Sequence, residues 1–384
     1  MDAQTQPQWT FTPQNPYQIN SVALDYNGDR CVFGTSSEYG QGDFAFYCCD
    51  GRGNALWSEP LSPSATQGFF WACISDNGDY AAGGGQYSED SGFLKAYDCH
   101  TGKVMLDVSL PGRVNQVSMN HDGRYLVAVF SDTVQLYRRE EDQYALRSSQ
   151  ALNAEELSFY GNSAVIATDG NTVVVSGRNY DQDKGYVFVF DIEDEKLAHL
   201  RGCLVDTASM RVAVSHHGQF WAAVLHDGSC VLFSRDDPAT PFARCQPTLA
   251  GLGIGYGLDL VCTEQNQVLA ACGVNISNSD DQGLLYVVKS DGKTASLAWQ
   301  APLTYPANPG ISLDRAGRFV TATDGAPEGK EESAGHFYLF DAQNGAALWR
   351  YQTSLMNWPM MITGSGKRIL GGSDDGLAYY WHNE

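Results

Sequence analysis

The sequence predicts an all-β protein folded as an eight-bladed β-propeller, with a seven-bladed ring as the alternative. A turn phrase recurs along the chain, its spacing matches one four-stranded blade, and the two chain ends complete each other. The 40 glycines and the 12% of aromatic residues suit many short strands joined by tight turns. We therefore expect residues 1–384 to form a single propeller domain of about eight four-stranded blades.

The recurring phrase is an alternating apolar run, a two-residue turn ending in glycine, and a second apolar run. It is clearest at residues 22–33, 72–82 and 117–128. Later copies turn at His217-Gly218, Ala316-Gly317 and Ser365-Gly366, and weaker copies turn at Asp169-Gly170 and Gln265-Asn266. Asn-Gly and Asp-Gly pairs favour β-hairpins because both of their residues can adopt a positive φ.

The spacing of the turns predicts the number of blades. Gly28 in the first turn and Gly366 in the last lie 338 residues apart, so seven intervals give about 48 residues each. This is a normal length for a propeller blade, and eight such units account for the whole chain.

Each unit continues with a third and a fourth strand. Residues 92–97 and 336–340 are predicted third strands, and fourth strands often carry Trp, as at Trp57, Trp299 and Trp349. The last unit stops after its third strand, at residues 379–381, and residues 8–11 supply a Trp-bearing fourth strand. A blade built from both ends closes the ring and removes two sheet edges.

The turn between the third and fourth strands resembles a named motif. Residues 96–106 resemble the A-x-D-x-x-T-G-K-x-x-W tryptophan-docking motif of quinoprotein-type propellers and the wider WD-type repeat superfamily, with Leu106 at the Trp position. That family includes pyrroloquinoline quinone dehydrogenases and also non-catalytic scaffolds. The resemblance implies a propeller whose Trp side chains lie between blades, without implying an enzyme. The chain departs from the dehydrogenases, which are usually longer and exported.

Charge and cysteine usage limit the classes of partner. A net charge of −21 disfavours nucleic acid and membrane surfaces, so a protein or peptide, and a basic one on electrostatic grounds, is the expected partner. The 10 cysteines lie mostly in apolar runs, as expected of buried thiols in a reducing compartment. Residues 1–6 do not resemble a signal peptide, so we expect a cytoplasmic protein.

Two groups of residues are candidate binding sites. Polar and acidic residues in the loops between second and third strands would gather on one face, where they could bind a basic peptide or, as an alternative, Ca²⁺. Polar and aromatic residues near the start of the innermost strands would surround the mouth of the central channel. The loop candidates are Glu38, Tyr39, Glu89, Asp90, Asp181, Asp183, Asp280, Asp281 and Asp374, and the mouth candidates are Asn20, Asn115, Tyr256, Asn308, Asn357 and Trp358.

Cys48-Cys49 is the one feature that suggests a quinone site, and we expect it to be ordinary packing at a strand end. No catalytic residues are predicted, because no motif combines a nucleophile, a base and a group that orients the base. The sequence therefore predicts a non-enzymatic scaffold that presents the acidic loops and the channel mouth to a partner. The alternative is a quinoprotein-like enzyme, or a small-ligand or Ca²⁺ sensor, with its ligand in the channel. The oligomeric state and the partner's identity are not predicted.

Overall fold

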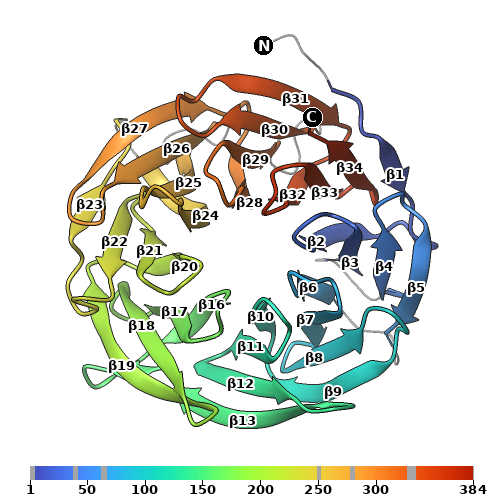
Figure 1. The fold of residues 1–384 in the computed structure, drawn as a ribbon, viewed down its shortest axis with the longest axis horizontal. Coiled ribbons are helices and arrows are strands. Elements are labelled where there is room, and N and C mark those ends of the chain that lie inside the picture. The colour runs from blue at the N-terminus through green and yellow to red at the C-terminus, as the bar shows by residue number, and fades with distance from the viewer. Residues whose placement is uncertain are drawn as a thin grey trace.

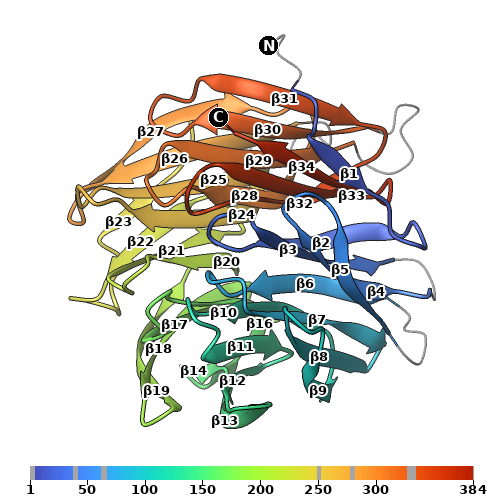
Figure 2. The same ribbon diagram turned by 45° about the vertical axis from the view of Figure 1, so that its right-hand side comes forward.

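The structure is a computed structural model, and it describes residues 5–37, 42–61, 67–248, 252–276, 282–326 and 334–383. In this part of the chain the secondary structure is entirely β, and no helix is present that could cross a membrane. The strands form antiparallel sheets arranged around a central axis (Figure 1). Seen obliquely, neighbouring sheets face one another around the ring (Figure 2).

Consecutive strands form four-stranded sheets in which the first strand of each run is the innermost, and the pair Ser36–Gly68 joins the first two sheets. The first three are β2 (Gln18–Leu24), β3 (Arg30–Ser36), β4 (Ala45–Asp50) and β5 (Ala55–Pro60); β6 (Gly68–Ile74), β7 (Tyr80–Ser88), β8 (Ser91–Asp98) and β9 (Val104–Pro111); and β10 (Val114–Met119), β11 (Tyr125–Phe130), β12 (Thr133–Arg139) and β13 (Tyr144–Ala151). A short hairpin of β14 (Asn153–Ala154) and β15 (Leu157–Ser158) follows.

The chain then continues in the same order around the ring. The next sheets are β16 (Tyr160–Ile166), β17 (Thr172–Asn179), β18 (Lys184–Glu193) and β19 (Lys196–Val205); β20 (Ser209–Val214), β21 (Phe220–Leu225), β22 (Cys230–Ser234) and β23 (Ala243–Cys245); β24 (Leu252–Cys262), β25 (Val268–Ile276), β26 (Gly283–Ser290) and β27 (Ala295–Pro302); and β28 (Ala307–Leu313), β29 (Phe319–Gly325), β30 (Gly335–Asp341) and β31 (Ala347–Thr353).

The predicted closure of the ring by the two chain ends is confirmed. The last sheet contains β32 (Asn357–Ile362), β33 (Arg368–Ser373), β34 (Ala378–His382) and, as its outermost strand, β1 (Trp9–Phe11). Trp9 pairs with Tyr380 in register, and their rings stack with centroids 4.6 Å apart. The Tyr380 hydroxyl donates to the Gly28 carbonyl at 2.7 Å, which ties this sheet to the next one.

The predicted turns join the first and second strands of their sheets, with one difference from expectation. Gly28, Gly78, Gly123, Gly170, Gly218, Gly317, Gly366 and Asn266 all have a positive φ. In the Asn-Gly turns only the glycine has a positive φ, and the expected turn length of two residues was wrong. The turns are longer than two residues, and a polar side chain closes them: Asp25 accepts bonds from the amides of residues 27–30.

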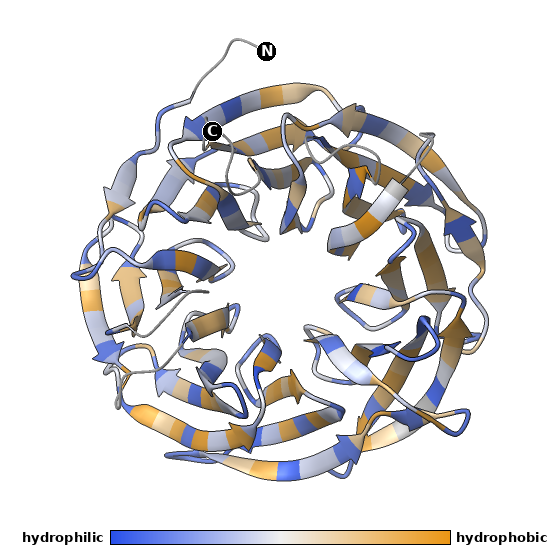
Figure 3. Cartoon of the chain, turned by 180° about the vertical axis from the view of Figure 1, so that it is seen from behind, coloured by the Kyte–Doolittle hydropathy of each residue, from blue (hydrophilic) through white to orange (hydrophobic). Residues whose placement is uncertain are grey.

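Apolar side chains between neighbouring sheets form the core. Phe46 of β4 packs on Phe69 of β6 and stacks on Tyr97 of β8, with both pairs of ring centroids 5.1 Å apart. Hydrophobic residues follow the strands, and hydrophilic ones concentrate in the connections (Figure 3). Burial of these aromatic faces between sheets is the main contribution to the stability of the ring.

Tryptophans of the fourth strands dock on the next sheet, as the motif implied. Trp57 Nε1 donates to the Cys99 carbonyl at 2.9 Å, and a Cβ at Gly102 would lie 2.9 Å from the Trp57 ring. Trp299 lies in the same way against the next sheet, where its Nε1 donates to Ala342 at 2.8 Å. Trp9 does so across the closure, with Nε1 donating to Gly51 at 3.2 Å. Each of these residues therefore holds two sheets together.

Candidate functional site

The antiparallel order gives the ring two different faces. The loop face carries the second-to-third strand connections, such as 180–183 and 374–377, and the sheet-to-sheet connections, such as 206–208 and 354–356. The turn face carries the first-to-second and third-to-fourth strand turns, such as 25–29 and 99–103. Each innermost strand runs from the loop face to the turn face, because neighbouring strands in a sheet are antiparallel.

The described acidic candidates lie on the loop face. Glu89, Asp90, Asp181 and Asp183 are exposed, and Asp374 is half-buried. Glu38, Tyr39, Asp280 and Asp281 lie outside the described residues. One aromatic and one aliphatic side chain on this face, neither of them a predicted site residue, are also exposed: Tyr180 at 62% and Leu355 at 37%.

The mouth of the channel is built by one repeated irregularity. Each innermost strand pairs regularly with the second strand except near its start, where a register shift marks a β-bulge. A bulge turns its extra residue away from the regular ladder, so it re-aims that side chain. The bulged segments contain Asn20, Phe70, Asn115, Asn162, Met210, Tyr256, Pro309 and Trp358.

Sequence reasoning found half of this ring, namely Asn20, Asn115, Tyr256 and Trp358. It missed Phe70, Met210 and Pro309 because those residue types share no chemistry with the asparagines, and it also missed Asn162, which does. Their spacing of one repeat from the predicted residues was the available signal. The predicted Asn308 and Asn357 are the last paired residues before their bulges.

Several asparagines of the mouth tie neighbouring sheets together. The side-chain amide of Asn115 donates to Gly161 at 2.7 Å, Asn162 donates to Ser209 at 3.0 Å, and Asn308 donates to Asn357 at 2.7 Å. These bonds satisfy carbonyls at the inner edge of the next sheet. Among the described residues, the Asn20 Oδ1, Asn357 Nδ2 and Trp358 Nε1 atoms are buried without a hydrogen-bond partner.

The channel contains a cavity of about 370 Å³, which we call the chamber. Its lining comes from all the innermost strands, β2, β6, β10, β16, β20, β24, β28 and β32. Side chains of one strand also cap amides of the next one: Ser118 accepts from Ile166 N at 3.2 Å, and Asp259 accepts from Leu313 N at 2.7 Å. Backbone N–H groups at the inner edges of the sheets thus find hydrogen-bond acceptors without a further strand.

Among the described residues, three charged side chains line the chamber: Asp76, which pairs with Arg315 at the turn face, and the unpaired Arg211 and Asp259. Arg211 extends from β20 to Trp71 of β6, with its guanidinium carbon 4.8 Å from the Trp71 ring centre. Burial, together with the nearby Arg113, lowers the pKa of Arg211 to about 10. Asp259 lies on β24, and burial raises its pKa to about 6, against the opposing effect of two backbone N–H donors.

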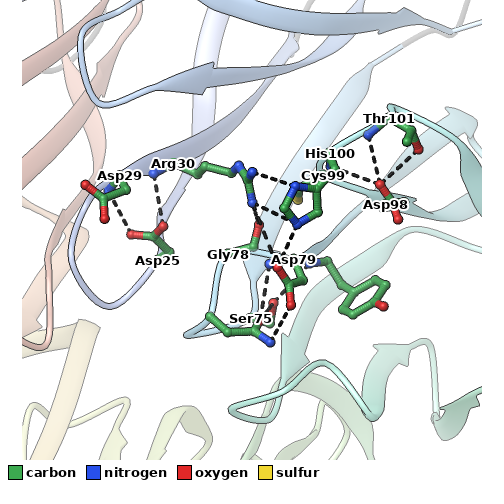
Figure 4. A network of polar contacts seen from close by, with 12 residues as sticks. Asp25, Asp29, Arg30, Ser75, Gly78, Asp79, Asp98, Cys99, His100 and Thr101 are labelled. Atoms are coloured by element: carbon green, nitrogen blue, oxygen red, sulfur yellow. Dashed lines mark hydrogen bonds and ion pairs between the residues drawn. The ribbon is translucent and has the colours of Figure 1, made fainter.

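Ion pairs bind the turn face together. Arg315 Nη2 reaches Asp76 at 2.9 Å, joining the turn after β28 to the turn after β6. Arg30 Nη2 contacts His100 Nδ1 at 2.7 Å, and His100 Nε2 contacts Asp79 at 2.8 Å, which links two neighbouring sheets (Figure 4). Charged groups on the turn face are thus engaged with one another.

The titratable side chains of the described residues bear on two kinds of site, a metal centre and a buried polar network. No group of three or more His, Cys, Asp or Glu in this part of the chain is placed to hold a metal ion. A buried network joins His336 Nδ1 to Asp324 at 3.0 Å and the Tyr338 hydroxyl to Asp324 at 2.6 Å. It lies between β29 and β30, and its residues are not among those lining the chamber.

Cys48 and Cys49 both lie within β4 and are buried on opposite sides of their sheet. Cys48 packs with Phe46 and Tyr97, and Cys49 packs with Cys31. β4 is a third strand, and neither cysteine lines the chamber. All ten cysteines are free thiols.

Comparisons with known proteins bear on the fold. No protein-family model matches the chain, and no curated protein matches it. Solved structures do match. Sqt1 of Saccharomyces cerevisiae has a TM-score of 0.70 at 10% identity, covering 99% of this chain and 100% of that one. The Dos1 propeller has a TM-score of 0.69 at 10% identity, covering 98% and 94%.

A third similar structure contains a bound peptide. Sqt1 of Chaetomium thermophilum, bound to the N-terminus of the ribosomal protein L10, has a TM-score of 0.68 at 12% identity and covers 96% of this chain and 98% of that one. At such identities the likeness establishes the fold alone. The chain is a β-propeller repeat protein, and its place in the quinoprotein branch stays a prediction.

Proposed function

We propose that this protein is a non-enzymatic binding propeller, which presents its loop face and the mouth of its channel to a protein or peptide partner. The observation that carries the proposal is the ring of bulged residues around the mouth. It places the half-buried Tyr256 and Trp358 on a scaffold of closed sheets. Aromatic side chains held rigidly lose little conformational freedom on binding, so they serve well as interface anchors.

The chemistry of the loop face favours a basic partner. The exposed Tyr180 lies between β17 and β18 beside Asp181 and Asp183, and the Arg178 guanidinium carbon lies 4.7 Å from its ring centre. An exposed aromatic residue flanked by carboxylates suits a peptide that carries lysine or arginine. The bound L10 N-terminus of the similar Sqt1 supports a peptide partner as the class.

The location of the binding face can be tested by site-specific photo-crosslinking. A photo-reactive residue placed at Tyr180 on the loop face should capture a partner from cell extract. The same residue at Glu141, exposed on the turn face, is the matched control. The double variant Asp90→Lys/Asp181→Lys should abolish capture, while Glu141→Lys/Asp142→Lys should leave it unchanged. Equal capture from both faces, or capture that survives the loop-face charge reversal, contradicts the proposal.

A further inference from the structure

Two of the three charged side chains that line the chamber in the described part of the chain are unpaired, and they carry opposite charges, whereas the third, Asp76, pairs with Arg315. The two are Arg211 and Asp259, and among the described residues neither forms an ion pair with the other or with a third group. Charges withdrawn from water are normally paired, because desolvation of an unpaired charge is costly. The chamber thus has one anion-binding and one cation-binding group available within a single cavity.

Arg211 has donors to spare. One of its Nη atoms donates to the Asn162 carbonyl at 3.2 Å, and the guanidinium lies over Trp71, which belongs to a strand three sheets away along the ring. A guanidinium has five N–H donors in a planar fork, a geometry that matches a carboxylate. One backbone bond fixes the group in place, and its other donors are available to a ligand in the chamber that Arg211 lines.

Asp259 carries a charge that its structural role does not require. Its carboxylate caps Leu313 N on the next innermost strand. In other innermost strands uncharged side chains do the same: Ser118 caps Ile166 N and Ser312 caps Ile362 N. Gln116, at the position of Asp259 in its own strand when counted back from the turn, caps Ala164 N, so no charge is needed. The carboxylate thus adds a negative charge to the chamber beyond what the strand contact needs.

We propose that the chamber binds a small zwitterion of the amino-acid type, with its carboxylate on Arg211 and its ammonium group on Asp259. The volume of about 370 Å³ suits such a molecule, since small-molecule sites range from roughly 300 to 1,000 Å³. Small residues such as Ser21, Ser163 and Gly257 also line the chamber and leave room for a ligand. The chamber shares three residues with the ring of bulged residues at the mouth, namely Asn20, Tyr256 and Pro309. Arg211 and Asp259 are not part of that ring, so either proposal can fail without the other.

Calorimetric titration and thermal-shift assays with matched probes test the proposal. γ-Aminobutyrate, butyrate and n-butylamine share one carbon skeleton and differ in their charges. The zwitterion should bind at least about tenfold more tightly than either singly charged probe, because it satisfies both groups. Glycine and ε-aminocaproate vary the distance between the charges and locate the best length. Absence of binding by all three zwitterions, or equal binding of butyrate or butylamine, overturns the proposal.

Two substitutions assign the ends of the ligand. Asp259→Asn keeps the acceptor for Leu313 N and should reduce zwitterion affinity to that of butyrate. Arg211→Gln should reduce it to that of butylamine, while Glu141→Gln and Arg52→Gln, both on exposed residues, should change nothing. Unchanged affinity in both chamber variants refutes the assignment. The comparison of probes on the unaltered protein needs no variant, so a folding defect in either variant does not prevent the test.

Discussion

Removal of the Trp9 side chain should open the ring. β1 is held by only three residue pairs, Trp9 with Tyr380, Thr10 with Tyr379 and Phe11 with Ala378. Trp9→Ala loses the stacking on Tyr380, worth about 0.5–1.5 kcal/mol, and the Nε1 bond to Gly51, worth about 0.5–1.5 kcal/mol. With the apolar contact of this half-buried ring added, we expect a loss of about 2–4 kcal/mol in the free energy of unfolding.

Urea denaturation and limited proteolysis measure this effect. Trp299→Ala is the matched control. Trp299 makes the same docking contact with the next sheet, but the four strands of its own sheet are consecutive in the chain. Both variants should lower the urea midpoint, but only Trp9→Ala should make the residues around β1 sensitive to protease in the folded protein. A midpoint for Trp9→Ala equal to that of the unaltered protein would refute the closure argument.

Three further results are expected. Gly102→Ala should destabilise the fold by about 1–3 kcal/mol in urea denaturation, because its φ is +72° and its Cβ would meet the Trp57 ring at 2.9 Å; an unchanged midpoint argues against the docking contact. Asp259 has a folded pKa of about 6, above its unfolded value, so its contribution to stability is complete below the unfolded pKa and disappears as pH rises through 6. Asp259→Asn should therefore gain melting temperature relative to the unaltered protein as pH rises from acid to neutral, and a constant difference contradicts the assigned pKa. Cys48 and Cys49 should react with a thiol reagent only after unfolding, because both are fully buried. Rapid reaction of these thiols in the folded protein would contradict their burial.

The fold could be predicted because its signals are local and repeated. Turns such as the one at Gly28 need a glycine. The strands on either side alternate in hydrophobicity, and this alternation is visible within a single repeat. The closure was predictable because the unit ending at Trp381 lacks a fourth strand that residues 8–11 can supply. The conformation of Asn27 was not, because its Asn-Gly turn is closed by the Asp25 side chain.

The site could be predicted only in part. Asn20 and Asn115 were found as polar residues at strand entrances, but their equivalence to Phe70 depends on the bulge, which is a property of pairing and not of residue type. Arg211 and Asp259 lie 48 residues apart in the chain and on neighbouring innermost strands, so only the ring brings them to one chamber. The acidic loops were recognised by composition, which says nothing about the exposed Tyr180 beside them.

Hydrogen–deuterium exchange with the partner captured by crosslinking tests the binding face most directly. Formation of the complex should slow amide exchange in residues 177–183 and 353–358 of the loop face and leave residues 98–103 and 140–143 of the turn face unchanged. Protection confined to the turn face would contradict the proposed function.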